Sequence, residues 1–522
     1  MYSRIGPQLL KLRTTAVNQK ILYRSLTLSS VAKTKLDRKL IRSAFQSIRN
    51  LSSATDEQKK PSFLFQWSLF GLAIATGAFA TYEYGRRSGL QQKPTTSPKN
   101  SSVQESSVAY IADQSKPQWD MSKENLAGAR QELIKLLGPG GVSDDLGTRI
   151  AHSATEWSEA PHGELDRASL VVYPTSTKDV SEIAKICHRR RIPMIAFSGG
   201  TSLESTLAAV NQEICIDFQK MDKIIQLNEH DLDVVVQPGI GYEQLNEFLA
   251  DKRLFFPPDP GPGAKIGGMV SQGCSGTNAF RYGTMKDWVL GLTVVLADGT
   301  IIKTRGRPRK SSAGYDLTRL FVGSEGTLGF VTEASLKLTA KQENTRVAVA
   351  VFPDIPSAIR TSIGIVRSGH MLAAMELLDD MAMRAVNESG YSDKTWPEKT
   401  TIFFKFSGHP ADIDAQAKEV ERLAKEQKCT EFAFAKTADE AEGLWEARKT
   451  ALWGLMALKK DPSDRFISAD ICVPISRLGD IIAATKDSFE ESGFIGSCLG
   501  HVGDGNYHAG VFFPSVSPTL TR

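Results

Sequence analysis

Residues 193–204 read PMIAFSGGTSLE. The apolar run Met194–Phe197 predicts a buried strand, and the residues SGGTS that follow predict a tight turn directly after it. Paired glycines allow positive φ and a close approach of the backbone to a ligand. Successive N–H groups in such a turn form a concave anion site that can hold a diphosphate. No lysine follows the glycines, which excludes a Walker phosphate loop. On its own a Gly-Gly turn more often only ends a strand, so the surrounding sequence decides.

The length and the charge of the chain bound its class. A chain of 522 residues with 41% hydrophobic and 23% charged residues is globular and long enough for several domains. Residues 1–60 hold 13 of the basic residues and three of the acidic ones, which leaves 50 basic and 56 acidic residues in 61–522, a net charge of −6. A mildly acidic body argues against nucleic acid and suits a basic partner. Six scattered cysteines without a Cys-x-x-Cys pair predict buried thiols rather than a disulfide scaffold.

The N-terminal part predicts targeting and anchoring. Residues 1–60 are basic, rich in serine and poor in acids, which is typical of a mitochondrial transit peptide; an unstructured basic tail is the alternative. Residues 63–82 contain no charge and are long enough to span about 30 Å as a helix, so they predict one transmembrane helix. The polar residues 88–118 predict a linker. We therefore expect anchoring in the mitochondrial inner membrane with the body in the intermembrane space, or retention in the matrix.

Strands and helices alternate around the glycine turn. Residues 170–173, 214–218 and 234–237 predict strands, and residues 242–250 predict an amphipathic helix. Between them, Ser176 predicts the N-cap of a further helix with Asp179 as the acidic member of a capping box. Residues 255–291 are rich in glycine and proline and show no obvious elements, which predicts a functional loop system.

Five motifs in order carry a family resemblance: PTSTKDV, SGGTSLE, PPDPGPGAKIGG, CSGTNAFRYGTM and GSEGTLGFVTE. Together they resemble the flavin domain of the vanillyl-alcohol-oxidase type and, more narrowly, its D-2-hydroxyacid dehydrogenase branch, over about residues 120–510. The resemblance implies an α+β fold with a two-part FAD-binding domain at 119–342 and an α+β substrate-capping domain at 343–522.

The resemblance also implies which residues hold FAD. Those expected around the diphosphate are Phe197, Ser198, Gly199, Gly200, Thr201, Ser202 and Leu203. Those expected along the flavin are Pro260, Ile266, Gly267, Gly268, Gly276, Asn278, Gly283 and Val331. No histidine occurs in 197–203, where some members link the flavin covalently, so noncovalent FAD is expected.

Arg448 is the first candidate catalytic residue. Ala441, Leu444, Trp445 and Arg448 share one face of a predicted helix, and an arginine on an apolar stripe needs a partner. That partner is either a protein carboxylate or the carboxylate of a 2-hydroxy acid, which a guanidinium grips as a fork. The matching arginine of similar dehydrogenases contacts substrate, so the resemblance favours the second alternative.

His501 and His508 are the second candidates. Asp504-Gly505 is a preferred two-residue hairpin turn, and with that turn His501 pairs directly with His508. Their Cβ atoms would then lie about 5 Å apart on one face, close enough to share a metal. A chance pair or packing role is the alternative. The resemblance implies that this motif binds a divalent metal, Zn or Mn.

The resemblance implies a function and a departure from the family. It implies oxidation of D-lactate to pyruvate, with electrons passed through FAD to cytochrome c; D-2-hydroxyglutarate is an alternative substrate, which Asp470 disfavours because a dicarboxylate calls for a basic residue. The family pattern continues with a Gly-Glu-His-Gly motif that supplies a further metal ligand and a probable base, and residues 509–522 lack it. A catalytically impaired flavin-binding protein is therefore the second hypothesis, and slow turnover with intact FAD binding is expected.

Overall fold

The computed structural model describes residues 119–153, 167–389, 395–459, 461 and 464–513. The predicted transit peptide, transmembrane helix and linker lie outside these residues. Among the helices that are described, none is both long and apolar enough to cross a membrane. The described part contains both helices and sheets, as the α+β prediction requires.

The first sheet carries the glycine turn of residues 198–202. It has four strands in the order β1-β2-β4-β3, with β2, β4 and β3 parallel and β1 antiparallel to β2. Its strands are β1 (Val142–Ser143), β2 (Leu170–Val172), β3 (Met194–Phe197) and β4 (Ile214–Asp217). Helices α4 (Lys123–Leu137) and α6 (Thr177–Arg190) bury apolar side chains against it, while the short α5 (Leu146–Ala151) follows β1. Parallel strands need such crossover connections. The glycine turn directly follows the carboxyl end of β3.

The N-terminus of α6 differs in one detail from its prediction. Ser176 is the N-cap and accepts the N–H of Asp179, as predicted. The Asp179 carboxylate, however, accepts the N–H and the hydroxyl of Thr175 rather than the N–H of Ser176. Asp179 therefore holds Thr175, the residue before the N-cap, through two hydrogen bonds.

The second sheet is antiparallel and has five strands in the order β5-β6-β10-β8-β9. Its strands are β5 (Ile224–Asn228), β6 (Asp233–Val236), β8 (Val289–Val295), β9 (Ile301–Lys303) and β10 (Phe330–Lys337). Helix α7 (Tyr242–Ala250), which has the predicted bounds, packs Leu245 and Leu249 into the core of this sheet. Helix α11 (Leu317–Phe321) follows β9, and a short ladder joins β7 (Leu254–Phe255) to β11 (Thr339–Ala340).

The glycine- and proline-rich stretch 255–291 is not free of elements, as the sequence had suggested. It forms the short helices α8 (Ile266–Gln272), α9 (Ala279–Tyr282) and α10 (Met285–Trp288). Helix α8 is held by its apolar residues, because Ile266, Met269 and Val270 are buried in the core of the second sheet. The sequence did not predict this helix because it contains two glycines, and glycine is a poor helix former.

The third sheet has seven strands in the order β15-β12-β14-β13-β17-β18-β16. Its strands are β12 (Thr345–Val351), β13 (Ala374–Leu378), β14 (Thr401–Ser407), β15 (Glu431–Phe434), β16 (Arg465–Cys472), β17 (Ile495–Gly500) and β18 (Asn506–Phe513). Every neighbouring pair whose register is defined runs antiparallel.

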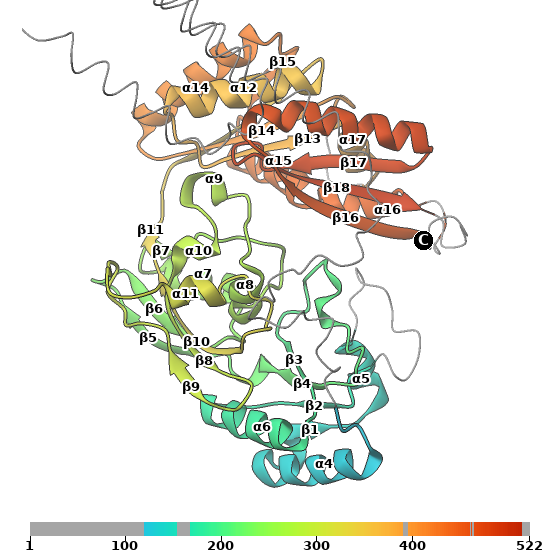
Figure 1. Cartoon of the computed structure of the whole chain (residues 1–522). Helices are drawn as coiled ribbons and strands as arrows, with labels where there is room; N and C mark the ends of the chain where they lie inside the picture. The colour runs from blue at the N-terminus through green and yellow to red at the C-terminus, as the bar shows by residue number, and fades with distance from the viewer. Residues whose placement is uncertain (1–118, 154–166, 390–394, 460, 462–463, 514–522) are drawn as a thin grey trace, which may run out of the picture. The chain divides into compact units, whose positions relative to one another are not determined.

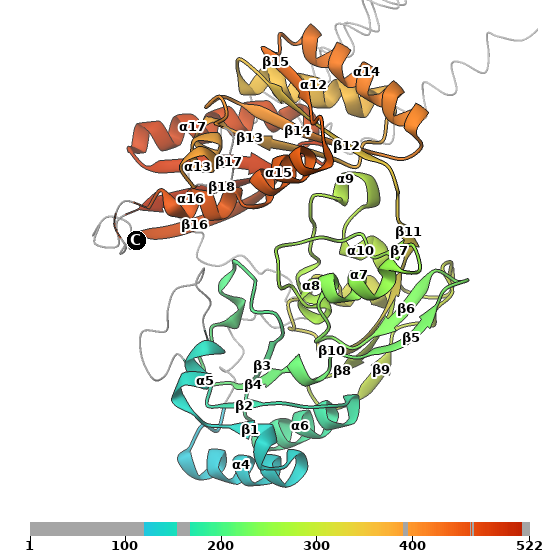
Figure 2. The same cartoon turned by 180° about the vertical axis from the view of Figure 1, so that it is seen from behind.

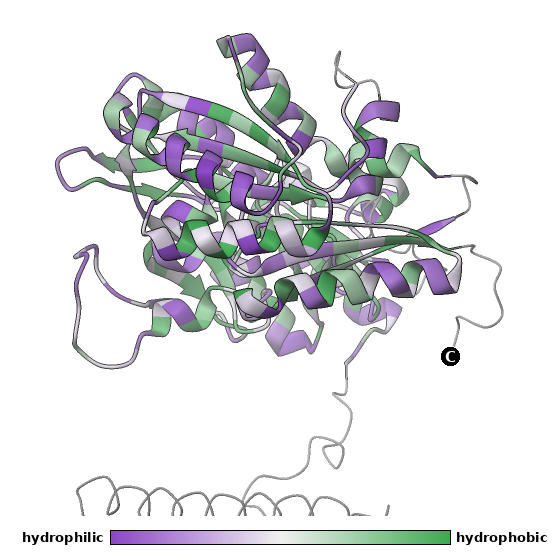
Figure 3. Cartoon of the chain, turned by 90° about the horizontal axis from the view of Figure 1, so that it is seen from above, coloured by the Kyte–Doolittle hydropathy of each residue, from purple (hydrophilic) through white to green (hydrophobic). Residues whose placement is uncertain are grey.

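Helices cover both faces of this third sheet (Figures 1 and 2). One face packs against α12 (Ile355–Ser368), α14 (Pro410–Glu426) and α17 (Leu478–Ser492). The other packs against α13 (Asp380–Ser389), α15 (Ala438–Lys449) and α16 (Ala451–Ala457). The helices alternate between hydrophilic and hydrophobic residues in Figure 3, as expected of helices with one face on a core. A polar group on either inner face of this sheet is therefore shielded from water and needs a partner.

All six cysteines are free. Cys187, Cys215 and Cys498 are buried as predicted, and Cys274 and Cys429 are partly buried. Cys472, at the end of β16, is exposed, so the prediction of a buried thiol is wrong there. Asn506 reaches this thiol with its amide, at 3.2 Å from Sγ.

Candidate functional site

The glycine turn lies at the wall of a cavity of about 570 Å³. Gly200 adopts φ +65°, and a Cβ on Gly199 would meet the carbonyl oxygen of Gly263 at 3.0 Å and the N of Lys265 at 3.1 Å. Both positions thus favour glycine, one because of its backbone conformation and the other because of the close approach of a second loop. The hydroxyl of Ser198 donates to the carbonyl of Pro238, which ties the turn to the segment after β6.

Most of the predicted cofactor residues line this single cavity. Those that do are Phe197, Ser198, Gly199, Gly200, Thr201, Ser202, Leu203, Pro260, Gly267, Gly268 and Val331. Ile266, Gly276, Asn278 and Gly283 are not among its lining residues. Ile266 is fully buried in the core of the second sheet, and Gly283 ends α9 at φ +79°. The contacts that any of these residues would make with FAD remain a prediction.

Sequence reasoning missed part of the cavity wall. Lys265, Gln272 and Glu325 line the cavity too. Glu325 has φ +52°, and its N–H donates to the carbonyl of Ser271 at 2.9 Å. Glu325 belongs to the motif GSEGTLG and Lys265 to the motif PPDPGPGAKIGG, so two of these three residues lie in motifs that carry the family resemblance.

A row of four polar side chains crosses the third sheet next to this cavity. We call it the polar row: Glu376, His501, His508 and Asp470. Glu376 lies on β13, His501 directly follows β17, His508 lies on β18, and Asp470 lies opposite His508 on β16. Asp470 also lines the cavity that holds the glycine turn. The polar row therefore runs from the cavity wall into the covered face of the third sheet.

The two histidines meet, but not through the predicted pairing. The register places His508 opposite Leu499, two residues before His501, so the imidazoles are diagonal neighbours on one face. Their ring centroids are 5.4 Å apart, at 88° to each other. The two-residue turn was wrong because the carbonyl of His501 accepts the N–H groups of both Asp504 and Asn506, which makes a longer loop. Gly505 fixes that loop, since its carbonyl accepts the N–H of Val473.

Glu376 is the buried centre of the site, with only 1% of its side chain exposed. Its Oε2 accepts from Nε and Nη2 of Arg448, at 3.1 and 2.6 Å. Its Oε1 lies 2.7 Å from Nδ1 of His501. Burial alone would raise the pKa of Glu376, but the charges and hydrogen bonds of His501 and Arg448 hold it below its ordinary value. Burial alone would likewise lower the pKa of His501, and the Glu376 carboxylate reverses this and raises it.

Arg448 therefore pairs with a protein carboxylate, that of Glu376, which was one of the two partners that the sequence left open. Its side chain is buried on the face of α15 that packs on the third sheet. A guanidinium has five N–H donors, and Glu376 takes one from Nε and one from Nη2. Among the described residues no acceptor contacts Nη1, so the pairing with Glu376 does not by itself exclude a substrate carboxylate.

Asp259 brings a charge from the glycine- and proline-rich stretch to the same place. It accepts from the hydroxyl of Thr277 at 2.6 Å and from the N–H of Asn278 at 2.9 Å. Burial raises the pKa of Asp259 to about 6 despite these donors and the opposing charge of His501. Asp259, in the loop after β7, and Glu376, on β13, thus both place a negative charge near His501, which makes this a strongly polarised site.

Comparisons with known proteins identify the family of this chain. Residues 168–305 match the family described as FAD binding domain, and residues 341–520 match FAD linked oxidases, C-terminal domain. The D-lactate dehydrogenase [cytochrome], mitochondrial, of Kluyveromyces lactis is 44% identical over 459 residues, which is 85% of this chain and 77% of that one. The chain belongs to the D-lactate dehydrogenase (cytochrome) family of FAD-linked oxidases.

Two further comparisons extend this result. The protein of the same name from Arabidopsis thaliana is 37% identical over 458 residues. The match spans 87% of this chain and 78% of the Arabidopsis protein. The solved structure of 4-ethylphenol oxidase from Gulosibacter chungangensis, in complex with isoeugenol, superposes with a TM-score of 0.61 at 20% identity. The superposition spans 75% of this chain and 83% of the oxidase, which shows a shared fold.

The histidine pair suits a metal only in part. Nδ1 of His501 faces Glu376, and Nδ1 of His508 faces Asp470 at 3.3 Å. Histidines that ligate metals commonly offer their other ring nitrogen to a carboxylate in this way, which leaves Nε2 for the metal. Over the stretches that the structure describes, however, no group of three or more His, Cys, Asp or Glu side chains is placed to hold a metal ion. Metal binding therefore remains a prediction with two candidate ligands.

The contact of Glu376 with two cations predicts a large effect on stability. Glu376→Gln should lower the free energy of unfolding by about 3 kcal/mol or more, because it leaves Arg448 buried without a counter-charge. Glu388→Gln is the matched control, since Glu388 pairs with Arg384 on the exposed side of α13. That change should cost about 1 kcal/mol or less. Urea unfolding of both variants measures the difference, and equal small effects would contradict the central place given to Glu376.

Proposed function

We propose that this protein is an FAD-dependent dehydrogenase that oxidises D-lactate to pyruvate. The observation that carries the proposal is that Arg448 and His501 converge on Glu376, at one end of a polar row whose other end lines the cavity of the glycine turn. The names of the relatives supply the substrate and the acceptor. A carboxylate-binding cation beside a proposed flavin cavity is what a 2-hydroxy acid requires.

The glycine turn would hold the FAD diphosphate, and bound FAD would supply the hydride acceptor. Backbone N–H groups at Ser198–Ser202 would donate to the phosphates without adding positive charge. Lys265, whose backbone N lies beside Gly199, adds a cation to the same cavity. Noncovalent binding is proposed because no histidine occurs in 197–203.

Arg448 would bind the carboxylate of the substrate through Nη1, while Glu376 holds Nε and Nη2 in place. Glu376 also fixes the orientation of the His501 ring through Nδ1, and Asp470 lies in the corresponding position for His508. Nε2 of both rings would hold a divalent metal, which supplies Lewis-acid polarisation of the substrate hydroxyl when bound. Arg448 and the histidines would thus act on opposite ends of a short 2-hydroxy acid.

Location and acceptor form the remaining part of the proposal. We infer a mitochondrial protein anchored in the inner membrane, supported by the basic residues 1–60, the uncharged residues 63–82 and the mitochondrial names of the relatives. Cytochrome c, a basic protein, would receive the electrons, and the net charge of −6 on residues 61–522 favours its approach.

The cofactor assignment predicts the behaviour of a glycine variant. Purified protein should carry FAD that acid precipitation releases into the supernatant. Gly200→Asp should abolish FAD binding, because a carboxylate would stand beside the diphosphate at a position of positive φ. Gly140→Asp is the control, since a side chain there meets nothing within 4 Å and Gly140 does not line the cavity.

The far-UV circular dichroism of Gly200→Asp shows whether the variant is folded. A folded Gly200→Asp protein that retains FAD would exclude the glycine turn as the diphosphate site. So would a wild-type protein that carries no flavin.

The carboxylate clamp predicts a separation of KM from metal content. Arg448→Lys keeps a cation beside Glu376 but loses the planar fork, so the KM for D-lactate should rise roughly tenfold or more in a cytochrome c reduction assay. His501→Ala and His508→Ala should instead lower the bound metal. Arg384→Lys is the control, because Arg384 forms an exposed ion pair with Glu388 on α13. It should change neither the KM nor the bound metal.

The same variants distinguish the two roles that the sequence left open for Arg448. If Arg448→Lys lowers the urea midpoint and leaves the KM unchanged, its partner is Glu376 alone and the substrate clamp is wrong. If the histidine variants retain full metal, the metal lies elsewhere.

A further inference from the structure

One exposed segment has a charge opposite to that of the body. Residues 303–320, which run from the end of β9 into α11, contain six basic residues and one acidic residue. Residues 61–522 as a whole carry a net charge of −6. The segment between the two elements forms neither helix nor strand, and residues 311–317 are all exposed.

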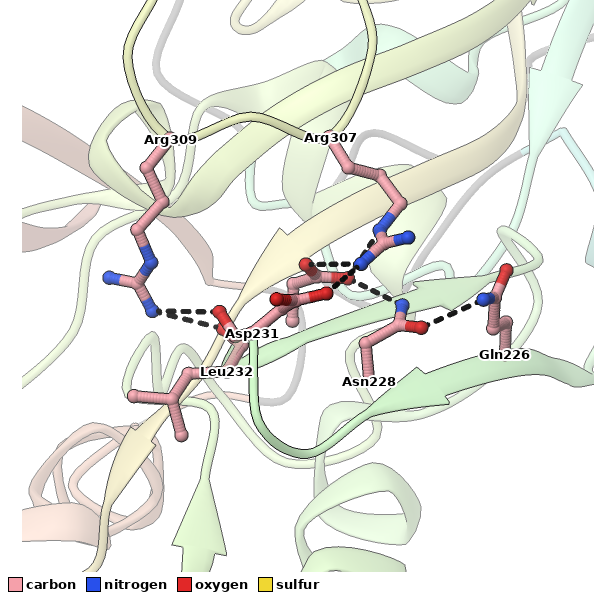
Figure 4. A network of polar contacts seen from close by, with 7 residues as sticks. Gln226, Asn228, Asp231, Leu232, Arg307 and Arg309 are labelled. Carbon is pink, nitrogen blue, oxygen red and sulfur yellow. Dashed lines mark hydrogen bonds and ion pairs between the residues drawn. The ribbon is translucent and has the colours of Figure 1, made fainter.

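The first half of this segment is fixed to the second sheet, as Figure 4 shows. Arg307 donates from Nε to the carboxylate of Asp233 at 2.9 Å and pairs with Asp231 at 2.5 Å. Arg309 donates to the carbonyls of Asp231 and Leu232, at 3.4 and 3.2 Å. Asn228 supports the same turn through a 2.7 Å contact with Asp233. These contacts hold the base of the segment on the β5–β6 turn, so its second half projects from a defined position.

Several cations around the segment lack an acidic partner. Within the described residues, no carboxylate lies at ion-pair distance from Arg305, Arg309 or Lys310. Lys337, on the neighbouring β10, donates to the backbone carbonyl of Asp287. Burial lowers the pKa of Lys337, and the nearby charges of Arg309, Arg319 and Arg305 lower it further, against the opposing charge of Asp287. These like charges repel one another, and an anion bound among them would relieve the repulsion.

Large apolar side chains are exposed beside these cations. Tyr315 is 94% exposed, Leu320 is 56% exposed and Leu317 is 42% exposed. Leu317 and Leu320 flank Arg319 on α11. Tyrosine and leucine next to arginine and lysine are the composition of segments that lie at the interface between water and a lipid bilayer.

We propose that residues 305–320, together with Lys337, bind the surface of an anionic lipid bilayer. The cations would contact the lipid phosphates, and Tyr315, Leu317 and Leu320 would enter the headgroup region. An acidic protein would satisfy the cations, but it would not by itself account for three apolar side chains exposed on the same projecting segment. Self-association through this surface would bring like charges together.

The position of this surface is compatible with turnover on a membrane. None of residues 305–320 lines the cavity of the glycine turn. Binding to lipid through this surface therefore leaves the cavity and the polar row accessible. The inference does not depend on the proposed substrate, because it rests only on the second sheet and the segment it holds.

Amide hydrogen exchange of the FAD-loaded full chain tests the proposal. Exchange is compared in solution, on phosphatidylcholine vesicles, and on vesicles that also contain phosphatidylglycerol. Peptides from 305–320 should exchange several-fold more slowly on the anionic vesicles only, and high salt should remove the difference because it screens the phosphates. The local readout is used because residues 63–82 could hold the whole chain on any vesicle.

Two variants sharpen the test. The triple variant Arg305→Ala, Lys310→Ala, Tyr315→Ser should lose this protection, since each lost cation near a lipid surface weakens binding roughly fivefold. Phe248→Ser with Lys252→Ala is the matched control, because it removes an exposed aromatic side chain on α7 and the cation just after the helix that lies over its ring. The control should keep the protection. Three results for the unmodified protein would each overturn the proposal. They are no protection of residues 305–320 on anionic vesicles, equal protection on neutral vesicles, or protection by soluble polyglutamate alone.

Discussion

The site depends on one buried carboxylate. Glu376 accepts two hydrogen bonds from Arg448 and lies 2.7 Å from a ring nitrogen of His501, with almost none of its side chain exposed. A lone carboxylate would be strongly unfavourable between the layers of the third sheet and its helices, and a lone arginine equally so. Each group is tolerated because the other is present. Together they fix the position of α15 relative to β13 and the orientation of the loop that follows β17.

A second constraint joins the glycine- and proline-rich stretch 255–291 to this carboxylate. Asp259 and Arg281 come from the stretch 255–291, yet they act on the third sheet. Asp259 sets a negative charge near His501, and Arg281 donates to the carbonyl and the hydroxyl of Ser407 at 2.7 and 2.8 Å. Gly503 lies so close to Phe280 that a Cβ would meet its ring at 2.4 Å. The loop between His501 and Asn506 is therefore packed against α9.

The sequence predicted what local patterns determine. The position of the strand before the glycine turn, the helix Tyr242–Ala250 and the N-cap at Ser176 follow from apolar periodicity and capping chemistry. The predicted burial of that strand was wrong, since all four of its residues are only partly buried. The two histidines were found because they flank a recognisable turn. Their exact pairing was not, because Val473, which directly follows β16, donates its N–H to the carbonyl of Gly505 and so stabilises a longer loop. Glu376 was missed because nothing in AMELLD marks a buried carboxylate, and its partners lie 72 and 125 residues away.

The central claim is that the cavity and the polar row form one site for a D-2-hydroxy acid beside a flavin. Anaerobic titration of the purified protein with D-lactate tests it most directly, by the absorbance of the oxidised flavin. The account predicts that D-lactate bleaches this absorbance and that L-lactate does not, because with the carboxylate on Arg448 and the hydroxyl at the histidines only one enantiomer directs its Cα hydrogen toward the flavin. A flavin that stays oxidised with D-lactate, or that both enantiomers bleach equally, would contradict it.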